Sequence, residues 1–405
     1  MTDESSLPRE PGAAAADPTS RSRPSSVALF LAFLRLGAVS FGGPAMVAYI
    51  KRLAVTRKGW LAEDEFQQGV ALCQAVPGAT AMQCAAYVGL RARGLRGAIC
   101  AFAGFGLPAF LLMLALSMAY QHALRVPAIT AMLAGLRALV VALVANAAWS
   151  FGRSTVKRLR EARIALATAL LFFFGVSPFV IVVTAGLAGA IFLRDPAPAP
   201  MTSHASPTST WKIFLPPAIV LAFAALLVAT LFLFDRDLAH LSLILMRIDL
   251  FAFGGGFAAV PLMFREFVLD HHWLPQSIFL DGIALGQVTP GPIVITATFV
   301  SYQIAGLVGA VVGTVAIFLP SLFAVVLVEP WFQRLRSSPR FRAATQGFLL
   351  SFVGLLAAVT IHFARMVSWN VSSAIIAALA LVALLLKIDV LWVVLAGAAA
   401  SALAM

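Results

Sequence analysis

An internal repeat constrains the fold of this chain more than any other feature of its sequence. A pattern of residues that starts near Phe33 returns in the same order about 212 positions later. The matching pairs are Arg35 and Arg247, Phe41-Gly42-Gly43 and Phe253-Gly254-Gly255, Trp60-Leu61 and Trp273-Leu274, Gln74-Ala-Val-Pro77-Gly78 and Gln287-Val-Thr-Pro290-Gly291, Leu107-Pro108 and Leu319-Pro320, and Gly135 and Gly347. Two copies of one pattern predict two structural halves, and in a membrane protein such halves usually build one site between them.

Composition places the chain in the bilayer. Of its 405 residues 61% are hydrophobic and 11% are charged, and the mean hydropathy is +0.95. Apolar runs of about 20 residues recur, which is the length that a helix needs to cross a membrane. We therefore expect an all-α integral membrane protein. The net charge of +12 comes from Lys and Arg in short loops between apolar segments, which indicates a positive-inside bias and no binding to nucleic acid.

The sequence offers little for metal or cofactor chemistry. Its three cysteines, Cys73, Cys84 and Cys100, lie in apolar stretches and form no Cys-x-x-Cys pair. The adjacent His271 and His272 are a weak metal signal without carboxylate or thiolate companions. No nucleotide-binding glycine pattern is present in the sequence. The prediction is a protein without metal, cofactor or enzymatic activity.

Two segments of biased composition divide the chain. Residues 1–26 contain no apolar core and predict a disordered cytoplasmic tail instead of a signal peptide. A second segment is too rich in Pro and Ser to span a membrane and predicts a linker. The expected organisation is a tail at 1–26, a first transmembrane repeat at 27–194, the linker at 195–211, a linking span at 212–238 and a second transmembrane repeat at 239–405.

The distribution of positive charge predicts that the two copies are inverted. Loops near 51–58, 91–96 and 153–163 of the first copy are basic, whereas the matching loops of the second copy are not. Beyond the Leu-Pro sites the bias is reversed, since residues 334–342 are basic and their counterparts are not. An inverted-topology repeat explains this reversal, and it places the basic loops of the first copy in the cytoplasm.

Proline and glycine predict breaks inside the apolar segments. If the basic loops that flank residues 66–90 share one side of the membrane, this segment enters and leaves by the same face, with Pro77-Gly78 at its centre. Pro290-Gly291-Pro292 marks the equivalent place in the second copy, and Gly42-Gly43-Pro44 interrupts residues 27–50. These sites predict broken or re-entrant helices, which are tolerated only within protein or beside a watery cavity. The alternative is that each segment crosses once.

Two equivalent arginines predict an anion site. Arg35 and Arg247 lie inside apolar helices, where a charge costs about 2.5–3.5 kcal/mol on insertion scales. Guanidinium suits a tetrahedral oxyanion, and half-helix N-termini at the breaks would add backbone donors. The predicted binding side chains are Arg35, Arg247, Ser40, Gln74, Thr80, Gln287 and Thr289, and the predicted backbone of the site is Gly42, Gly43, Pro77, Gly78, Gly254, Gly255, Pro290 and Gly291. We expect the anion near the midplane between the two arginines.

Structural roles stay open for the same residues. Either arginine can instead cap the carbonyl groups of a broken helix or pair with Asp249. Asp249 matches Gly37 of the first copy, which makes it a candidate proton-coupling site present in one half only, with an interhelical ion pair as the alternative. The two repeated glutamines suit bonds to broken backbone as well as to substrate.

The repeated motifs resemble the chromate ion transporters of the CHR superfamily, in their long form with two homologous halves. The resemblance covers nearly the whole chain from about Phe30. It implies chromate export across the bacterial inner membrane, coupled to the proton gradient by antiport, with sulfate as a related anion. One departure is Ala79, where the second copy has Pro292, so that the two half-sites are not chemically equivalent.

The predicted partners are chromate or sulfate, protons and the lipid bilayer, and the sequence leaves a homodimer open. An anion channel is the rival class, because channels and carriers can share inverted repeats. Coupling of the flux to protons would separate the two.

Overall fold

The computed structural model describes residues 24–41, 43–193 and 210–404, and all regular structure in these ranges is helical. Residues 1–23 of the predicted tail and 195–209 of the predicted linker therefore lie outside the described residues. The first repeat contains α1 (Ser26–Val39), α2 (Gly43–Lys51), the π-helical η2 (Arg52–Arg57), α3 (Glu63–Ala75), α4 (Thr80–Ala123), α5 (Pro127–Thr155), α6 (Leu159–Phe173) and α7 (Pro178–Phe192).

The second repeat follows a linking helix and has the corresponding helices in the same order, with short additional elements between some of them. In chain order the elements are α8 (Thr210–Phe234), which links the halves, and then α9 (Arg236–Phe251), η3 (Gly256–Ala258), α10 (Ala259–Phe264), η4 (Arg265–Asp270), α11 (Gln276–Val288), η5 (Ile293–Ile295), α12 (Thr296–Val328), η6 (Glu329–Trp331), α13 (Phe332–Ser337), α14 (Pro339–Met366), α15 (Val371–Leu385) and α16 (Val390–Ala404).

Several helices have the length and composition of membrane spans. Within the described ranges five stretches qualify: α4, α5, residues 214–234 of α8, residues 293–337 around α12, and α14. Shorter helices of 15 residues form two pairs, α6 with α7 and α15 with α16, and all of them except α6 are apolar along their length. The prediction of an all-α membrane protein with a repeated pattern of helices is confirmed.

The second hairpin of each repeat is a broken helix pair whose two arms run back along each other. In the first repeat, α3 ends at Ala75 and α4 begins at Thr80, and the Tyr87 hydroxyl donates to the carbonyl of Glu65 at 3.2 Å. In the second repeat, the hydroxyl of Thr296 in α12 donates to the carbonyl of Gly282 in α11 at 3.4 Å. Both arms of each hairpin therefore start and end on the same side, as the re-entrant interpretation predicts.

The first hairpin of each repeat has the same form. Phe33 of α1 stacks on Trp60, which lies beyond η2, with ring centroids 6.4 Å apart. In the second repeat, Arg247 of α9 pairs with Glu266 of η4 at 2.6 Å, and the rings of His240 and His271 lie 5.3 Å apart. The chain thus returns along itself in both copies after the break that follows α1 or α9.

A second reversal lies inside α4 and inside α12. Gly94 has φ +65° and ψ −158°, and its counterpart Gly306 has φ +61° and ψ −149°. Such positive φ values favour glycine, which explains why both copies place it there. After its kink, each copy of the repeat changes direction once more and continues as a long span.

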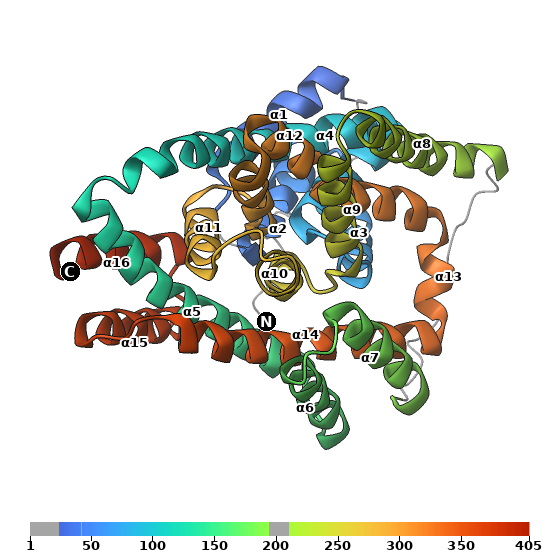
Figure 1. Ribbon diagram of the computed structural model, residues 1–405. Helices are drawn as coiled ribbons and strands as arrows, with labels where there is room; N and C mark the ends of the chain where they lie inside the picture. The colour runs from blue at the N-terminus through green and yellow to red at the C-terminus, as the bar shows by residue number, and fades with distance from the viewer. Residues whose placement is uncertain (1–23, 42, 194–209, 405) are drawn as a thin grey trace, which may run out of the picture.

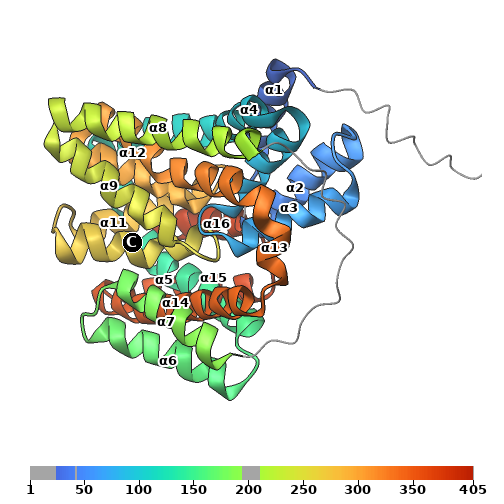
Figure 2. The same cartoon turned by 90° about the vertical axis from the view of Figure 1, so that its right-hand side faces the viewer.

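The breaks of the hairpins lie between two layers of helices. In Figures 1 and 2, α1, α4, α8 and α12 form one layer and α6, α7, α14 and α15 another, with α2, α3 and α11 between them. Figure 2 places α2 and α3 on one side of the molecule and α9 and α11 on the opposite side, as inverted repeats require. Irregular backbone is thereby enclosed by protein.

Candidate functional site

The four breaks meet through a pair of crossed backbone hydrogen bonds. The Gly78 N–H donates to the carbonyl of Ala252 at 2.9 Å, and the Gly291 N–H donates to the carbonyl of Ser40 at 2.8 Å. Gly78 matches Gly291 in the repeat, and Ser40 matches Ala252, so each bond is the counterpart of the other. Each bond joins the second hairpin of one repeat to the first hairpin of the other. The site is therefore shared by both halves.

The predicted backbone residues border these breaks, with one exception. They are Gly43, Pro77, Gly78, Gly254, Gly255, Pro290 and Gly291, whereas Gly42 lies outside the described residues. Four of them have φ values between +95° and +121°, namely Gly78, Gly254, Gly255 and Gly291. These conformations are rarely adopted by other residues, so glycine is what allows the chain to turn here.

Three helix N-termini converge beside Gly255 and Gly256. A Cβ atom at Gly255 would lie 3.3 Å from the hydroxyl of Thr80, the first residue of α4. A Cβ atom at Gly256, the first residue of η3, would lie 2.8 Å from Ile293, the first residue of η5. Helix N-termini present free N–H groups and a positive dipole end, so their convergence suits an anion. Gln287, at the end of α11, has a buried amide nitrogen without a hydrogen-bond partner among the described residues.

A chain of polar groups connects the first-repeat break to a buried carboxyl group. The Ala79 N–H donates to Ser321 Oγ at 2.9 Å, and the Ser321 hydroxyl donates to Asp249 Oδ2 at 2.7 Å. Asp249 is fully buried, and its Oδ1 has no partner in the part of the chain that the structure describes. No cation among these residues forms an ion pair with Asp249, which argues against the alternative of an interhelical ion pair. Its counterpart Gly37 has no side chain.

The other predicted polar side chains divide between the break and its surroundings. Ser40 is buried and its hydroxyl donates to Leu36 at 2.7 Å, while the Thr289 hydroxyl donates to Gly286 at 3.0 Å. Both hydroxyl groups thus bond to carbonyl groups in the last turn of their own helix. Gln74, in contrast, is exposed.

The two predicted arginines lie away from the breaks, in different surroundings. Arg247 pairs with Glu266 at 2.6 Å and lies over the ring of Phe179, 4.2 Å from its centroid. Its side chain is 48% exposed, so it is not buried with Asp249, and the predicted alternative of an Arg247–Asp249 pair is wrong. Arg35 is also exposed. The structure therefore does not support the expectation that the anion lies between Arg35 and Arg247.

Arg35 instead lines a basic cleft of about 800 Å³ between α1 and the segment 49–58. Arg52, Arg57 and Lys58 line the same cleft, together with apolar residues of α1. None of these four cations has an ion pair within the described residues. Four unpaired cations around one opening concentrate anions near it.

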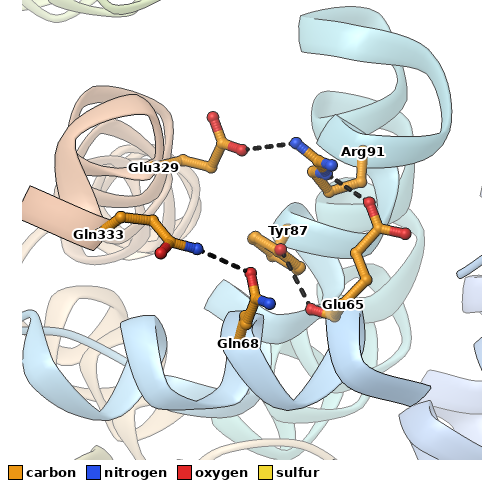
Figure 3. A network of polar contacts seen from close by, with 6 residues as sticks. All are labelled: Glu65, Gln68, Tyr87, Arg91, Glu329 and Gln333. Atoms are coloured by element: carbon orange, nitrogen blue, oxygen red, sulfur yellow. Dashed lines mark hydrogen bonds and ion pairs between the residues drawn. The ribbon is translucent and has the colours of Figure 1, made fainter. Parts of the chain in front are cut away.

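Two polar clusters lie outside the predicted site, one at the base of each second hairpin. In the first, Arg91 joins Glu65 at 2.6 Å and Glu329 at 3.0 Å, and it links α4 to α3 and η6 (Figure 3). In the second, Arg137 of α5 donates to both oxygens of Asp281 at 2.7 and 2.8 Å. The Tyr120 hydroxyl adds a bond of 2.6 Å to this carboxylate.

The pairing of Arg137 with Asp281 could not be predicted from the repeat, because the two residues lie on helices far apart in the chain. Arg137 has Leu349 as its counterpart and Asp281 has Gln68, so the repeat gave no support for a shared role.

Comparison with known proteins assigns this architecture to a family. A family model described as chromate transporter matches residues 27–190 and again residues 239–402. The chain belongs to the chromate transporter family. This is a family of transporters and not of enzymes, as predicted.

Relatives of the transporter extend over most of its length. An uncharacterized transporter of Methanocaldococcus jannaschii is 39% identical over 93% of both chains. A chromate transport protein of Cupriavidus metallidurans is 32% identical over 89% of this chain and 87% of its own. A chromate transport protein of Pseudomonas aeruginosa is 32% identical over 85% of this chain and 82% of its own. No solved structure matches the chain.

Proposed function

We propose that the protein exports a divalent oxyanion, chromate first and sulfate second, across the bacterial inner membrane by proton-coupled alternating access. The observation that carries the proposal is the pair of crossed bonds from Gly78 to Ala252 and from Gly291 to Ser40. They gather four helix breaks from two inverted repeats at one place, which is how secondary transporters with inverted repeats form a substrate site. The names of two relatives add chromate as the substrate.

The anion binds at the helix N-termini around Gly255 and Gly256 in this proposal. Backbone N–H groups and the Thr80 hydroxyl supply neutral donors there, and Gln287 supplies an amide nitrogen that is buried without a partner. Neutral donors bind a dianion without holding it as tightly as a buried cation would, and a carrier must release its substrate. Ser40, Thr289 and the repeated prolines then shape the breaks and need not touch the anion.

The basic cleft supports an outward direction of transport. The positive-inside rule places the loops that contain Arg52, Arg57 and Lys58 in the cytoplasm. With Arg35 they form an opening that attracts anions from that side. At the equivalent surface of the second repeat, Glu266 and Asp270 neutralise Arg247 and Arg265. An anion is thus captured inside and released outside.

Asp249 is the residue proposed to carry the proton. An ionised carboxyl group that is buried without a cation is costly, and uptake of a proton removes that cost. Antiport, which the sequence resemblance implied, is one form of coupling that this residue could support. Binding of the proton together with the anion is the other.

Chromate uptake into everted membrane vesicles tests the proposal, because export from cells becomes uptake in this orientation. We expect uptake that requires an energised membrane, collapses with an uncoupler and is inhibited by sulfate. Vesicles that contain a variant with Thr80→Val and Gln287→Leu serve as the matched control, and we expect them to lose most of the uptake. Labelled sulfate movement without chromate movement would reassign the substrate. Flux that ignores the proton gradient would favour an anion channel.

A further inference from the structure

We infer that Ser321 transmits the charge state of Asp249 to the break at Gly78-Ala79, so that the proton and the anion bind together. The inference rests on the proposed function, because it specifies how the two ions are coupled in the same site. Ser321 is a positioning residue in this scheme, because it acts through Asp249 and the backbone of the break.

The hydroxyl group of Ser321 has a single hydrogen, which makes it a switch. In the structure this hydrogen is donated to Asp249 at 2.7 Å, while the oxygen accepts the Ala79 N–H at 2.9 Å. Hydrogen bonds to an ionised carboxylate are the stronger kind and polarise the bonds next to them. An ionised Asp249 therefore holds both the Ser321 hydrogen and the Ala79 N–H away from the break.

A proton on Asp249 reverses this arrangement. The neutral carboxyl group can donate its own hydrogen to Ser321 Oγ, since a protonated carboxyl has one donor and the hydroxyl oxygen is an acceptor. The hydrogen of Ser321 is then free to turn toward Gly78. Ser321 Oγ lies directly against Gly78, where a Cβ atom would overlap it, so the hydroxyl reaches the break only because this residue is glycine. Protonation thus adds a donor to the break and removes a negative charge beside it.

The relay consists of Asp249 and Ser321 of the second repeat and the Ala79 N–H of the first. These three parts meet at one of the two equivalent breaks, and all three are absent from the other. Asp249 is replaced by Gly37, and Ser321 is replaced by Ala109 at the equivalent point, where a Cβ atom at Gly291 would lie 2.8 Å from the Ala109 Cβ. The third part, the Ala79 N–H, matches Pro292, which has no N–H to donate. The rest of the break is built alike in both halves, down to the crossed hydrogen bonds. A structural cap alone would not require this joint difference.

Within the described residues, the elements packed against α9 contain few other titratable groups. On α9 itself, Asp237 and His240 lie near the opposite end of the helix from Asp249. Tyr302 is the one titratable residue of α12, while α10 and residues 214–234 of α8 contain none. Cys84 and Tyr87 are the titratable residues of α4 closest in sequence to its break. Glu266 of η4 is bound to Arg247.

Joint binding defines the charge that moves. One proton with a dianion leaves one net negative charge, and a membrane potential that is negative inside drives this charge outward. The relay therefore favours co-transport of the proton over the antiport that the sequence resemblance implied.

The test is the pH dependence of the KM for chromate in everted vesicles, measured at two pH values at which chromate itself remains a dianion. For the wild type we expect a several-fold lower KM at the lower pH. Ser321→Ala, which copies Ala109 of the first repeat, should retain transport but lose this difference, and Ser321→Thr should restore it. Ser117→Ala is the control, because Ser117 is a buried serine that donates only to its own helix, at Met113.

Each outcome decides a separate point. If the wild type moves no chromate, the proposed function fails. If the wild type transports chromate and Ser321→Ala keeps the same pH dependence of the KM, the relay is wrong and the function stands. A KM that rises at the lower pH in the wild type would contradict joint binding and favour antiport. An inactive Ser321→Ala is resolved by Ser321→Thr, since transport by this variant without pH dependence of its KM also contradicts the relay.

Discussion

The surface beside α1 and the surface beside α9 come from the same stretch of the repeat, yet they hold their arginines differently. Arg35 shares an open cleft with three more cations and has no acid beside it among the described residues. Arg247 is neutralised by Glu266, whose counterpart in the first repeat is the apolar Leu53. One sequence pattern thus provides a positive opening on one side and a neutral surface on the other.

The polar clusters at the bases of the two second hairpins also differ, in how far their charged side chains are exposed. The cluster around Arg91 is solvated, with side-chain exposures of 44% for Arg91, 23% for Glu65 and 21% for Glu329 (Figure 3). On the opposite side, Asp281 is fully buried and bound by Arg137. The acids of the Arg91 cluster reach water, whereas the acids that pair with Arg137 and Arg247, Asp281 and Glu266, are at most 5% exposed. The two sides should therefore respond differently to the same substitution.

The largest effect is expected for Arg137→Gln. It leaves the buried carboxylate of Asp281 with Tyr120 as its remaining partner, and breaking a buried pair in this way costs about 3–5 kcal/mol. Thermal unfolding in detergent measures the loss. The double variant Arg137→Gln with Asp281→Asn should recover most of the stability, because no charge is then buried. If the single variant were as stable as the double variant, the interpretation that Arg137 neutralises a buried Asp281 carboxylate would be contradicted.

A smaller loss is expected for Arg247→Gln. Glu266 is only 5% exposed, but Arg247 is 48% exposed, so water can reach the vacated place. We expect a loss of about 2 kcal/mol, within the range for a charged group left without its partner. Arg35→Gln is the matched control at the equivalent position and should change stability by less than about 0.5 kcal/mol, as exposed substitutions do. Equal unfolding temperatures for the two variants would remove the contrast between the surfaces.

Transport should show the opposite ranking of these two arginines. Arg35→Gln removes one of four cations that attract the anion, so the KM for chromate in everted vesicles should rise several-fold. The rise should be largest at low salt, because screening weakens steering between exposed charges. Arg35→Lys keeps the charge and should keep the KM. A KM for Arg35→Gln that does not change with salt would place Arg35 outside the path of the anion.

The repeat and the breaks could be predicted because their causes are local. Proline removes a backbone donor and glycine permits positive φ, so Pro77-Gly78 and Pro290-Gly291 end a helix wherever they occur in an apolar segment. The mismatch with Gly37 also made Asp249 a candidate proton site from the sequence alone, and this role stays a proposal. What the sequence could not supply was the crossing of the two hairpins, because Gly78 binds Ala252 only after two distant segments have packed together.

The arginines show where reasoning from the repeat stops. A charge inside an apolar helix indicates that something compensates it, but not on which side of the helix the compensation lies. Glu266 compensates Arg247 from its own hairpin, and Arg35 faces a cleft, so the two equivalent residues have different roles. Ser321 was overlooked for a related reason, since a serine in an apolar helix usually bonds to its own backbone, as Ser117 does.

The smallest effect is expected at the cluster in Figure 3. Arg91→Gln removes two ion pairs, but all three side chains remain in contact with water, and exposed pairs contribute about 0–1 kcal/mol. We expect a loss of about 0.5 kcal/mol in detergent, and less at high salt. Arg137→Gln measured under the same conditions should keep its large loss at high salt, because buried pairs are screened much less. If Arg91→Gln proved as damaging as Arg137→Gln, the two sides would be equally closed, and the difference between an open and a sealed face would disappear.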